Sequence, residues 1–289
     1  RFIKAGPDEF IYARYGNPTS RMFEDRIANL EGAEDAFATA SGMAAVNGAL
    51  MCFAKPGDHI VSAKALFGSC LYVLDILARF GVEVSYVDGT DLEQWKAAIR
   101  PDTSAVFFET VSNPTLEVID IAGVAELAHA VGALVVVDNV FVTPVYSRAI
   151  AQGADVVVYS STKHIDGAGR CMGGVICGTR QFVREVAEPY LKHTGAAISP
   201  FNAWVMLNGL TTLDLRVRAQ SDNALAVAQG LRGLRGVARV IYPGLPDHPQ
   251  YDLVQRQIGA GGTMVAVDVG SKEAAFAAMN RMQLFQISN

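Results

Sequence analysis

The residues best suited to chemistry in this sequence follow a short apolar run at 156–159. Ser160 and Thr162 carry hydroxyls that can hold an anion, and the next side chain is the amine of Lys163. A buried strand that ends in this way delivers its lysine to the mouth of a sheet, where ligands bind. We interpret Lys163 as a residue that forms a Schiff base with an aldehyde cofactor, and a surface lysine after a strand is the alternative.

Two other expected strand ends carry polar residues. Asp138 follows the apolar residues 135–137, and Glu109 follows an apolar stretch at 104–108, with Asn113 shortly after it. An unpaired carboxylate at the end of a buried strand is costly, so Asp138 needs a positive partner such as a protonated ring nitrogen. Pyridoxal phosphate enzymes use a lysine on the aldehyde, an acid at the pyridine nitrogen, and hydroxyls with backbone amides on the phosphate. The alternative is that Asp138 is only a turn or helix-cap carboxylate. The presence of Lys163 at the end of the next strand favours a role for Asp138 at the cofactor.

A phosphate site is expected where a helix opens directly after a strand, at Ser41, Gly42 and Met43. Free backbone amides and the helix dipole favour an anion there, although any capped helix shows the same pattern. The glycine-rich stretches at 167–169 and 259–262 do not give the spacing of a dinucleotide-binding loop. The sequence therefore argues against a Rossmann-type site.

Apolar segments of strand length alternate with segments of helical periodicity through the first two thirds of the chain. This alternation predicts an α/β fold with a mostly parallel seven-stranded sheet covered by helices on both faces. Ligands bind at the carboxyl ends of the strands in such sheets, which is where Asp138 and Lys163 fall. Strands are expected at 36–39, 59–63, 82–87, 104–108, 134–137, 155–159 and 174–177.

Three parts of the chain are expected. An aromatic and turn-rich arm spans 1–18, a large cofactor-binding domain spans 19–200, and a smaller α+β domain spans 201–289. The smaller domain begins with a long helical region at 201–231 and continues with strands at 237–242 and 263–269. We expect the small domain to be incomplete at its end and the chain to be trimmed before Arg1.

Composition excludes several classes of protein. Of the 289 residues, 51% are hydrophobic, which provides a sizeable core, and the net charge of −5 argues against a nucleic acid partner. The apolar runs are too short for a membrane span, and no signal peptide is recognised. The four cysteines form no metal motif, so we expect buried thiols, no metal site and a cytoplasmic location.

The order and spacing of five motifs resemble the Cys/Met-metabolism pyridoxal phosphate enzymes over almost the whole chain. The motifs lie at 12–19, 41–43, 109–114, 137–139 and 160–163. The resemblance implies the aspartate aminotransferase-like fold, which is PLP fold type I. It also implies a homotetramer built from dimers that share active sites.

The resemblance also assigns roles to individual residues. Lys163 is implied to carry the cofactor and Asp138 to face its pyridine nitrogen, and these two with Tyr12 are the expected catalytic residues. The resemblance implies that the phosphate is bound by Ser160, Thr162, Gly42 and Met43, and that Asn113 lies at the ring hydroxyl and the substrate. It also implies that Tyr12 and Arg14 reach the phosphate bound by a neighbouring subunit, and that Ser288 contacts the substrate carboxylate. The family's leucine after that serine is replaced by Asn289, and its carboxylate-binding arginine is absent from this sequence.

One departure from the family bears on the reaction. Many relatives place a tyrosine over the cofactor ring, and this chain has Phe67, which can stack on the ring but cannot transfer a proton. A thiol leaving group, with a pKa of about 8.5, benefits from protonation, whereas a carboxylate, with a pKa of about 4, hardly needs it. We therefore expect replacement at the γ-carbon of an acyl-homoserine.

The stretches at 192–195 and 199–204 resemble the O-succinylhomoserine sulfhydrylase branch of the family. That branch uses sulfide and forms homocysteine and succinate, a step of methionine biosynthesis. The alternatives are a cystathionine γ-synthase with cysteine as nucleophile, a methionine or cystathionine γ-lyase, and a cofactor-binding protein without catalytic activity.

Overall fold

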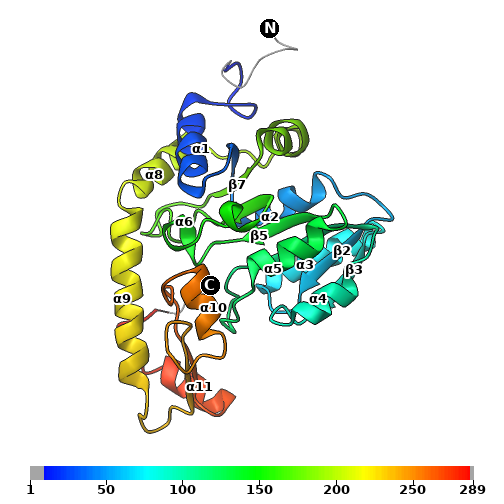
Figure 1. The fold of residues 1–289 in the computed structure, drawn as a ribbon. Coiled ribbons are helices and arrows are strands. Elements are labelled where there is room, and N and C mark those ends of the chain that lie inside the picture. The colour runs from blue at the N-terminus through cyan, green and yellow to red at the C-terminus, as the bar shows by residue number, and fades with distance from the viewer. Residues whose placement is uncertain (1–9, 287–289) are drawn as a thin grey trace.

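The structure, a computed structural model, describes residues 10–286 and is built around a seven-stranded sheet (Figure 1). The order across the sheet is β1-β7-β6-β5-β4-β2-β3, with β7 antiparallel to both of its neighbours and every other adjacent pair parallel. The predicted mostly parallel α/β sheet is therefore confirmed. The strands are β1 (Asp35–Thr39), β2 (His59–Ala63), β3 (Glu83–Val87), β4 (Thr103–Glu109), β5 (Leu134–Asp138), β6 (Val156–Tyr159) and β7 (Gly174–Gly178).

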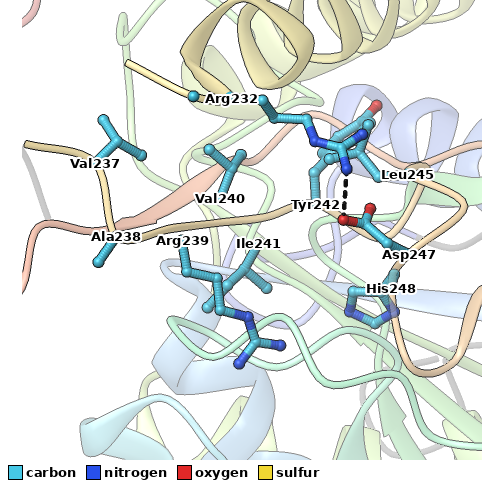
Figure 2. Close-up of a pocket in the computed structure, with 11 residues that line it drawn as sticks. Arg232, Val237, Ala238, Arg239, Val240, Ile241, Tyr242, Leu245, Asp247 and His248 are labelled. Atoms are coloured by element: carbon cyan, nitrogen blue, oxygen red, sulfur yellow. Dashed lines mark hydrogen bonds and ion pairs between the residues drawn. The ribbon is translucent and has the colours of Figure 1, made fainter. Parts of the chain in front are cut away.

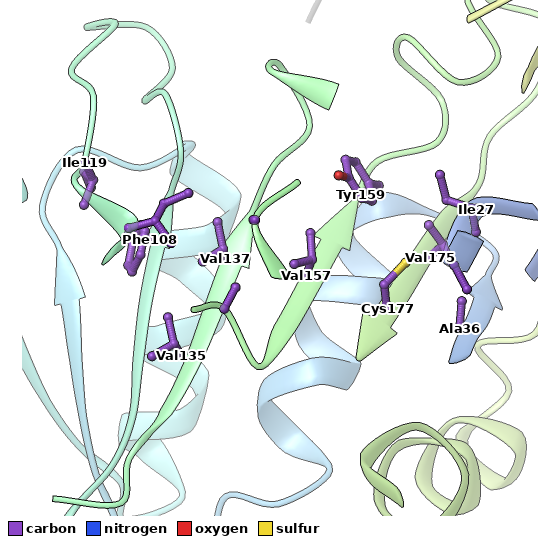
Figure 3. Packing of buried hydrophobic residues seen from close by; sticks show 14 of the residues in the cluster. Ile27, Ala36, Phe108, Ile119, Val135, Val137, Val157, Tyr159, Val175 and Cys177 are labelled. Atoms are coloured by element: carbon purple, nitrogen blue, oxygen red, sulfur yellow. The ribbon is translucent and has the colours of Figure 1, made fainter. Parts of the chain in front are cut away.

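Helices cover both faces of the sheet, and this explains why the central strands are apolar without alternation. On β5, Val135 and Val137 belong to the core formed with α1 (Pro18–Glu31), α4 (Leu92–Ala98), α5 (Ile121–His129) and α8 (Pro200–Leu210) (Figure 3). Val136 between them points to the opposite core. That second core is formed with α2 (Gly42–Met51), α3 (Gly68–Arg79), a π-helical segment (Phe182–Ala187) and α7 (Glu188–Thr194).

A long helix connects the core of the large sheet to a second, smaller group of elements. The region expected as one helical stretch consists of α8 and α9 (Leu213–Leu231), separated at Thr211 and Thr212. Val217 of α9 is buried in the core of the large sheet, whereas Ala228 packs with Tyr242 in a separate cluster. Figure 1 shows α9 running from α8 along the smaller group.

The smaller group contains a two-stranded antiparallel sheet, β8 (Arg239–Ile241) and β9 (Ala266–Asp268). Two helices accompany it, α10 (Tyr251–Gln257), which the sequence analysis did not predict, and α11 (Lys272–Met279). A short helix α6 (Thr143–Tyr146) and a 3-10 turn (Ile150–Gln152) connect β5 to β6. The division of the chain at residues 18 and 200 stays a prediction.

Two glutamine side chains dock α10 against the loop that follows β4. Val118 N donates to Gln250 Oε1 at 2.8 Å, and the Gln250 side-chain amide donates to the carbonyl of Val118. Gln257 makes the same pair of contacts, accepting from Ile121 N at 3.0 Å and donating to Ile119 O at 2.9 Å. The smaller group is thus tied to a loop that begins beside Glu109. None of the helices within residues 10–286 is long and apolar enough to cross a membrane.

Candidate active site

The register of the sheet places two acidic residues side by side. Glu109 and Asp138 are the last residues of β4 and β5, and their Cα atoms are direct partners in the parallel register. β6, which leads to Ser160 and Lys163, lies next to β5 on its other side. The expected gathering of strand-end residues at one edge of the sheet is therefore present.

Asp138 is a buried carboxyl group with a strongly acidic environment. Its Oδ1 accepts a hydrogen bond from Val140 N at 3.0 Å, and the residue is only 8% exposed. Burial is the largest cause that raises the Asp138 pKa, and the negative charge of Glu109 raises it further. A cation placed beside Asp138 would lower this pKa and favour the ionised carboxylate, and a protonated ring nitrogen would be such a cation.

A buried thiol completes this acidic cluster. The Cys70 Sγ and one carboxyl oxygen each of Glu109 and Asp138 lie within 4.8 Å of one another. Burial, followed by the charges of the two carboxyl groups, raises the Cys70 pKa far above its ordinary value, so the group stays a neutral thiol. The sequence analysis classed Cys70 as a buried thiol without a role, and only the sheet order brings it to the two acids.

Lys163 lies on a tight turn after β6. Lys163 N donates to Ser160 O at 3.1 Å, and Gly167 N donates to Lys163 O at 2.8 Å. Lys163 also lines a cavity of about 890 Å³ between this turn and the smaller group of elements. The other lining residues include Phe141, His164, Gln220, Thr263, Met264 and Phe285.

Neighbouring His164 has a bridging role that the sequence analysis did not foresee. One of its ring nitrogens lies 3.2 Å from Val140 O and the other 2.8 Å from Thr263 Oγ1. Burial lowers the His164 pKa, which favours the neutral ring. The side chain therefore joins the segment after Asp138 to the smaller group.

The predicted phosphate residues meet where α2 begins. A Cβ on Gly42 would lie 2.4 Å from the Cβ of Ser160, so only glycine allows this approach. Gly42 and Met43 are the first two residues of α2, whose N-cap Ser41 accepts from Ala44 N at 3.1 Å. Their amides are among those without a partner inside the helix, which suits an anion beside Ser160.

The hydroxyl of Thr162, another predicted phosphate contact, is engaged with the backbone. Thr162 Oγ1 accepts from Gly173 N at 3.1 Å and lies 3.2 Å from Gly173 O. This arrangement ties the lysine turn to the segment before β7. Any anion contact from Thr162 would be made in addition to these bonds.

Phe67 and Asn113, predicted at the cofactor ring, are both attached to Glu109. Phe67 N donates to Glu109 Oε1 at 2.7 Å, and Asn113 N donates to Glu109 Oε2 at 2.9 Å. Phe67 is 39% exposed, so the residue is not enclosed by its own chain. The sequence analysis noted Glu109 as a strand-end residue but assigned it no function.

Tyr12 and Arg14 are not brought to the site by their own chain. The Arg14 guanidinium lies 4.7 Å from the centre of the Tyr15 ring and donates to Lys192 O. Tyr12 is 56% exposed and packs edge-on against Tyr15, with ring centres 5.7 Å apart. Within the described part of the chain, Arg14 makes no hydrogen bond or ion pair with Ser160 or Thr162. Ser288 lies outside the described residues.

A second, smaller hollow lies beside β8 and contains none of the predicted site residues (Figure 2). Its volume is about 220 Å³. Arg232 and Asp247 meet in it, with Arg232 Nη2 2.7 Å from Asp247 Oδ2. This arginine is thus engaged by an acid, and Lys163 does not line the hollow.

Comparison with known proteins decides the family. The family described as Cys/Met metabolism PLP-dependent enzyme matches residues 2–289. The chain belongs to this PLP-dependent enzyme family.

Relatives within the family include O-succinylhomoserine sulfhydrylases and, at 39% identity or less, methionine γ-lyases. An O-succinylhomoserine sulfhydrylase of Mycobacterium tuberculosis is 51% identical over 98% of this chain and 71% of its own length. The protein of the same name from Pseudomonas aeruginosa is 46% identical over 96% of this chain and 69% of its own length. The crystal structure of metB from Corynebacterium glutamicum superposes with a TM-score of 0.94 at 34% identity, covering 99% of this chain and 76% of that one. The predicted PLP fold type I is therefore confirmed.

The residues of this chain fit the family's cofactor. Asp138 offers a buried acid for the pyridine nitrogen, and Gly42 with Ser160 forms a close-fitting cradle at a helix N-terminus for the phosphate. Lys163, on the cavity wall, offers an amine for the aldehyde. These are the three groups that PLP requires from a protein.

Proposed function

We propose that this chain catalyses the replacement of the acyl group of O-succinylhomoserine by sulfide, giving homocysteine and succinate. In this exchange a C–O bond at the γ-carbon breaks, a C–S bond forms there, and no oxidant or reductant is consumed. The observation that carries the proposal is Phe67, which has no acidic proton, at the position where the family resemblance expects the residue stacked on the cofactor ring. The sulfhydrylase names of the relatives at 46% and 51% identity support the same reaction.

Each site residue has a defined task in this proposal. Lys163 would hold the cofactor through its amine and would be the nearest base for moving protons at the α- and β-carbons of the substrate. Asp138 would keep a proton on the pyridine nitrogen by placing a negative charge beside it, and the neighbouring charge of Glu109 would add to this effect. The bound cofactor supplies an electron-accepting ring. Ser160, Gly42 and Met43 orient it by its phosphate.

Phe67 selects the leaving group in this scheme. Its ring supplies no proton, so departure of a thiolate is not assisted. Succinate, with a carboxyl pKa of about 4, departs as an anion without that help. The site therefore favours an acyl ester over a thioether as substrate.

A substrate panel tests the reaction. The protein with bound PLP is assayed with O-succinylhomoserine or O-acetylhomoserine, each with sulfide or cysteine, and with methionine and cystathionine alone. We expect the largest kcat/KM for O-succinylhomoserine with sulfide. Faster consumption of methionine or cystathionine would contradict the leaving-group argument, and a preference for cysteine would indicate a cystathionine γ-synthase.

The role of Lys163 is tested by borohydride reduction followed by peptide mapping. We expect the reduced cofactor to remain attached at Lys163 and turnover to be lost. Lys163→Ala should abolish both the attachment and the reaction. Turnover by Lys163→Ala at the wild-type rate would remove this residue from the scheme.

The proposal includes a second copy of the chain and a cytoplasmic location. Arg14 and Tyr12 lie away from the phosphate residues of their own chain, and the family resemblance assigns them to a neighbouring subunit's site. We propose a tetramer of two such dimers, with no metal, nucleic acid or membrane involved.

A further inference from the structure

Glu109 connects two loops that surround the proposed cofactor ring. Its side chain is buried at the end of β4, with 1% of the residue exposed. One carboxyl oxygen accepts the amide of Phe67 at 2.7 Å, and the other accepts the amide of Asn113 at 2.9 Å. Phe67 lies in the loop after β2 and Asn113 in the loop after β4, so a single side chain fixes both.

Only a carboxylate of this length suits both contacts. An ionised carboxyl group has two acceptor oxygens and no donor, whereas glutamine would turn an NH₂ group toward one of the two N–H groups. Aspartate is shorter by one methylene. Burial raises the Glu109 pKa and the two amides lower it, so these hydrogen bonds offset part of the cost of burying the charge.

The same carboxyl group lies beside the acid of the site. Glu109 and Asp138 are direct partners in the register of β4 and β5. One carboxyl oxygen of each, together with the Cys70 Sγ, lies within 4.8 Å of the others. Glu109 therefore contacts the loop of the stacking ring and the loop of Asn113 from a position next to the pyridine-nitrogen acid.

We propose that Glu109 is a positioning residue that holds Phe67 and Asn113 around the cofactor through their backbone amides. This inference rests on the proposed function, because the tasks of Phe67 and Asn113 are part of it. Glu109 itself takes no part in bond making. It fixes the positions of the Phe67 ring and the Asn113 side-chain amide before the cofactor binds.

The direct test is amide hydrogen exchange on the cofactor-free protein, comparing wild type with Glu109→Gln. We expect the amides of Phe67 and Asn113 to exchange at least about tenfold faster in the variant, because each bond to a charged acceptor contributes substantially to protection. Glu24→Gln is the matched control. Glu24 is also buried and accepts one backbone amide, Ala38 N at 2.9 Å. It additionally pairs with Arg21 and Arg184, and it lies outside the site.

A second readout follows the cofactor. PLP is titrated into each variant, and the circular dichroism of the bound chromophore reports the orientation of its ring. Glu109→Gln should raise the dissociation constant at least about tenfold and change the ellipticity per bound cofactor, whereas Glu24→Gln should change neither. Unchanged exchange at Phe67 and Asn113, or unchanged affinity and ellipticity, would overturn the proposal.

Two further measurements keep the test decisive if Glu109→Gln does not fold. Glu109→Asp keeps the charge but cannot reach both amides, so it should reproduce the faster exchange at one or both positions. In the wild type, exchange of both amides at the rate of an unstructured peptide would refute the proposal by itself. Failure of the proposed function looks different, because a wild type that binds no PLP would still show both amides protected.

Discussion

Three successive residues after β6 have different environments, although all three carry a hydroxyl. Ser160 lies against Gly42 at the start of α2, and Thr162 bonds to the backbone of Gly173. Ser161 is fully buried, and its Oγ has no hydrogen-bond partner within the described part of the chain. A buried hydroxyl without a partner costs free energy, so its presence does not stabilise the turn.

This contrast predicts opposite outcomes for two serine variants. Ser161→Ala should leave PLP affinity unchanged and raise the free energy of unfolding by about 1 kcal/mol, since an unsatisfied polar group is removed. Ser160→Ala should weaken PLP binding at least about tenfold through the lost phosphate contact. Fluorescence titration with PLP and urea unfolding measure the two effects, and equal affinities for both variants would refute the assignment of Ser160.

A buried network behind the site holds the ends of β5 and β6 together. The Tyr159 hydroxyl donates to Glu31, and the Asn139 side-chain amide donates to Tyr159 Oη at 2.8 Å. The Asn139 side-chain oxygen accepts from Thr110 Oγ1 at 2.9 Å. Burial raises the Glu31 pKa from 4.5 to about 7, against the lowering effect of its hydrogen bonds from Tyr159 and Ile150.

The raised Glu31 pKa predicts a stability that falls as the pH rises. Between pH 4.5 and about 7 the unfolded chain releases the Glu31 proton while the folded chain keeps it. The contribution of this proton to the free energy of unfolding is therefore complete below pH 4.5 and is lost above about pH 7. The loss amounts to about 3 kcal/mol at 1.36 kcal/mol per pKa unit. Urea unfolding at several pH values should show a flatter profile for Glu31→Gln. The exposed Glu34→Gln serves as control, and a profile for Glu31→Gln as steep as that of the control would contradict the argument.

At the scale of elements, the first turn of α9 supports the turn that carries Lys163. Arg216 Nη1 donates to His164 O at 2.7 Å, and Arg216 Nη2 donates to Gly209 O at 2.8 Å. Gly167 has a φ of +71°, and a Cβ there would lie 1.8 Å from Arg216 Nη1. The helix, the guanidinium and the glycine therefore fix the backbone directly after Lys163.

Removal of this guanidinium should loosen the lysine turn. We expect Arg216→Ala to lower the free energy of unfolding by about 2 kcal/mol, because buried carbonyls lose a charged donor. It should also speed the release of PLP. Arg218→Ala is the control, since Arg218 pairs with Asp214 on the surface of the same helix at 2.9 Å. Equal PLP release rates in the two variants would show that α9 does not support the turn.

At the scale of the whole molecule, the proposed dimer gives a role to the arm that carries Tyr12 and Arg14. In the single chain, Arg14 packs on Tyr15 and donates to Lys192. Arginine suits phosphate because its planar fork donates two hydrogen bonds at once. The proposed dimer places this fork at a phosphate held by Ser160 and Gly42 of the other copy.

Mixing two inactive variants tests this sharing of sites. Arg14→Ala and Lys163→Ala should each have low activity alone. After they are unfolded and refolded together, mixed dimers contain one site with both native residues, so activity should reappear. No recovery, with mixed dimers present by mass spectrometry of tagged chains, would show that Arg14 serves its own chain or no site.

Local sequence determined the elements and the chemistry they carry. The apolar residues 134–137, bounded by turn residues, sufficed for β5, and Asp138 and Lys163 indicated the cofactor, which the resemblance of five motifs to a known family then implied. The spacing of apolar residues and the types of residue determine conformation over short stretches of the chain, where sequence neighbours interact with one another. For the same reason α10 was missed, since its side chains are secured by glutamine contacts with a loop far away in sequence.

Tertiary structure alone decided which polar groups meet. The order β4-β5-β6 and the register of Glu109 with Asp138 bring two acids and Cys70 together. No local pattern carries that register, because parallel strands are paired through crossover connections and their neighbours lie far apart in the chain. The sequence by itself determined that a lysine, an acid and a phosphate cradle exist. Only the packed sheet decided that Glu109 stands among them and holds the loops of Phe67 and Asn113.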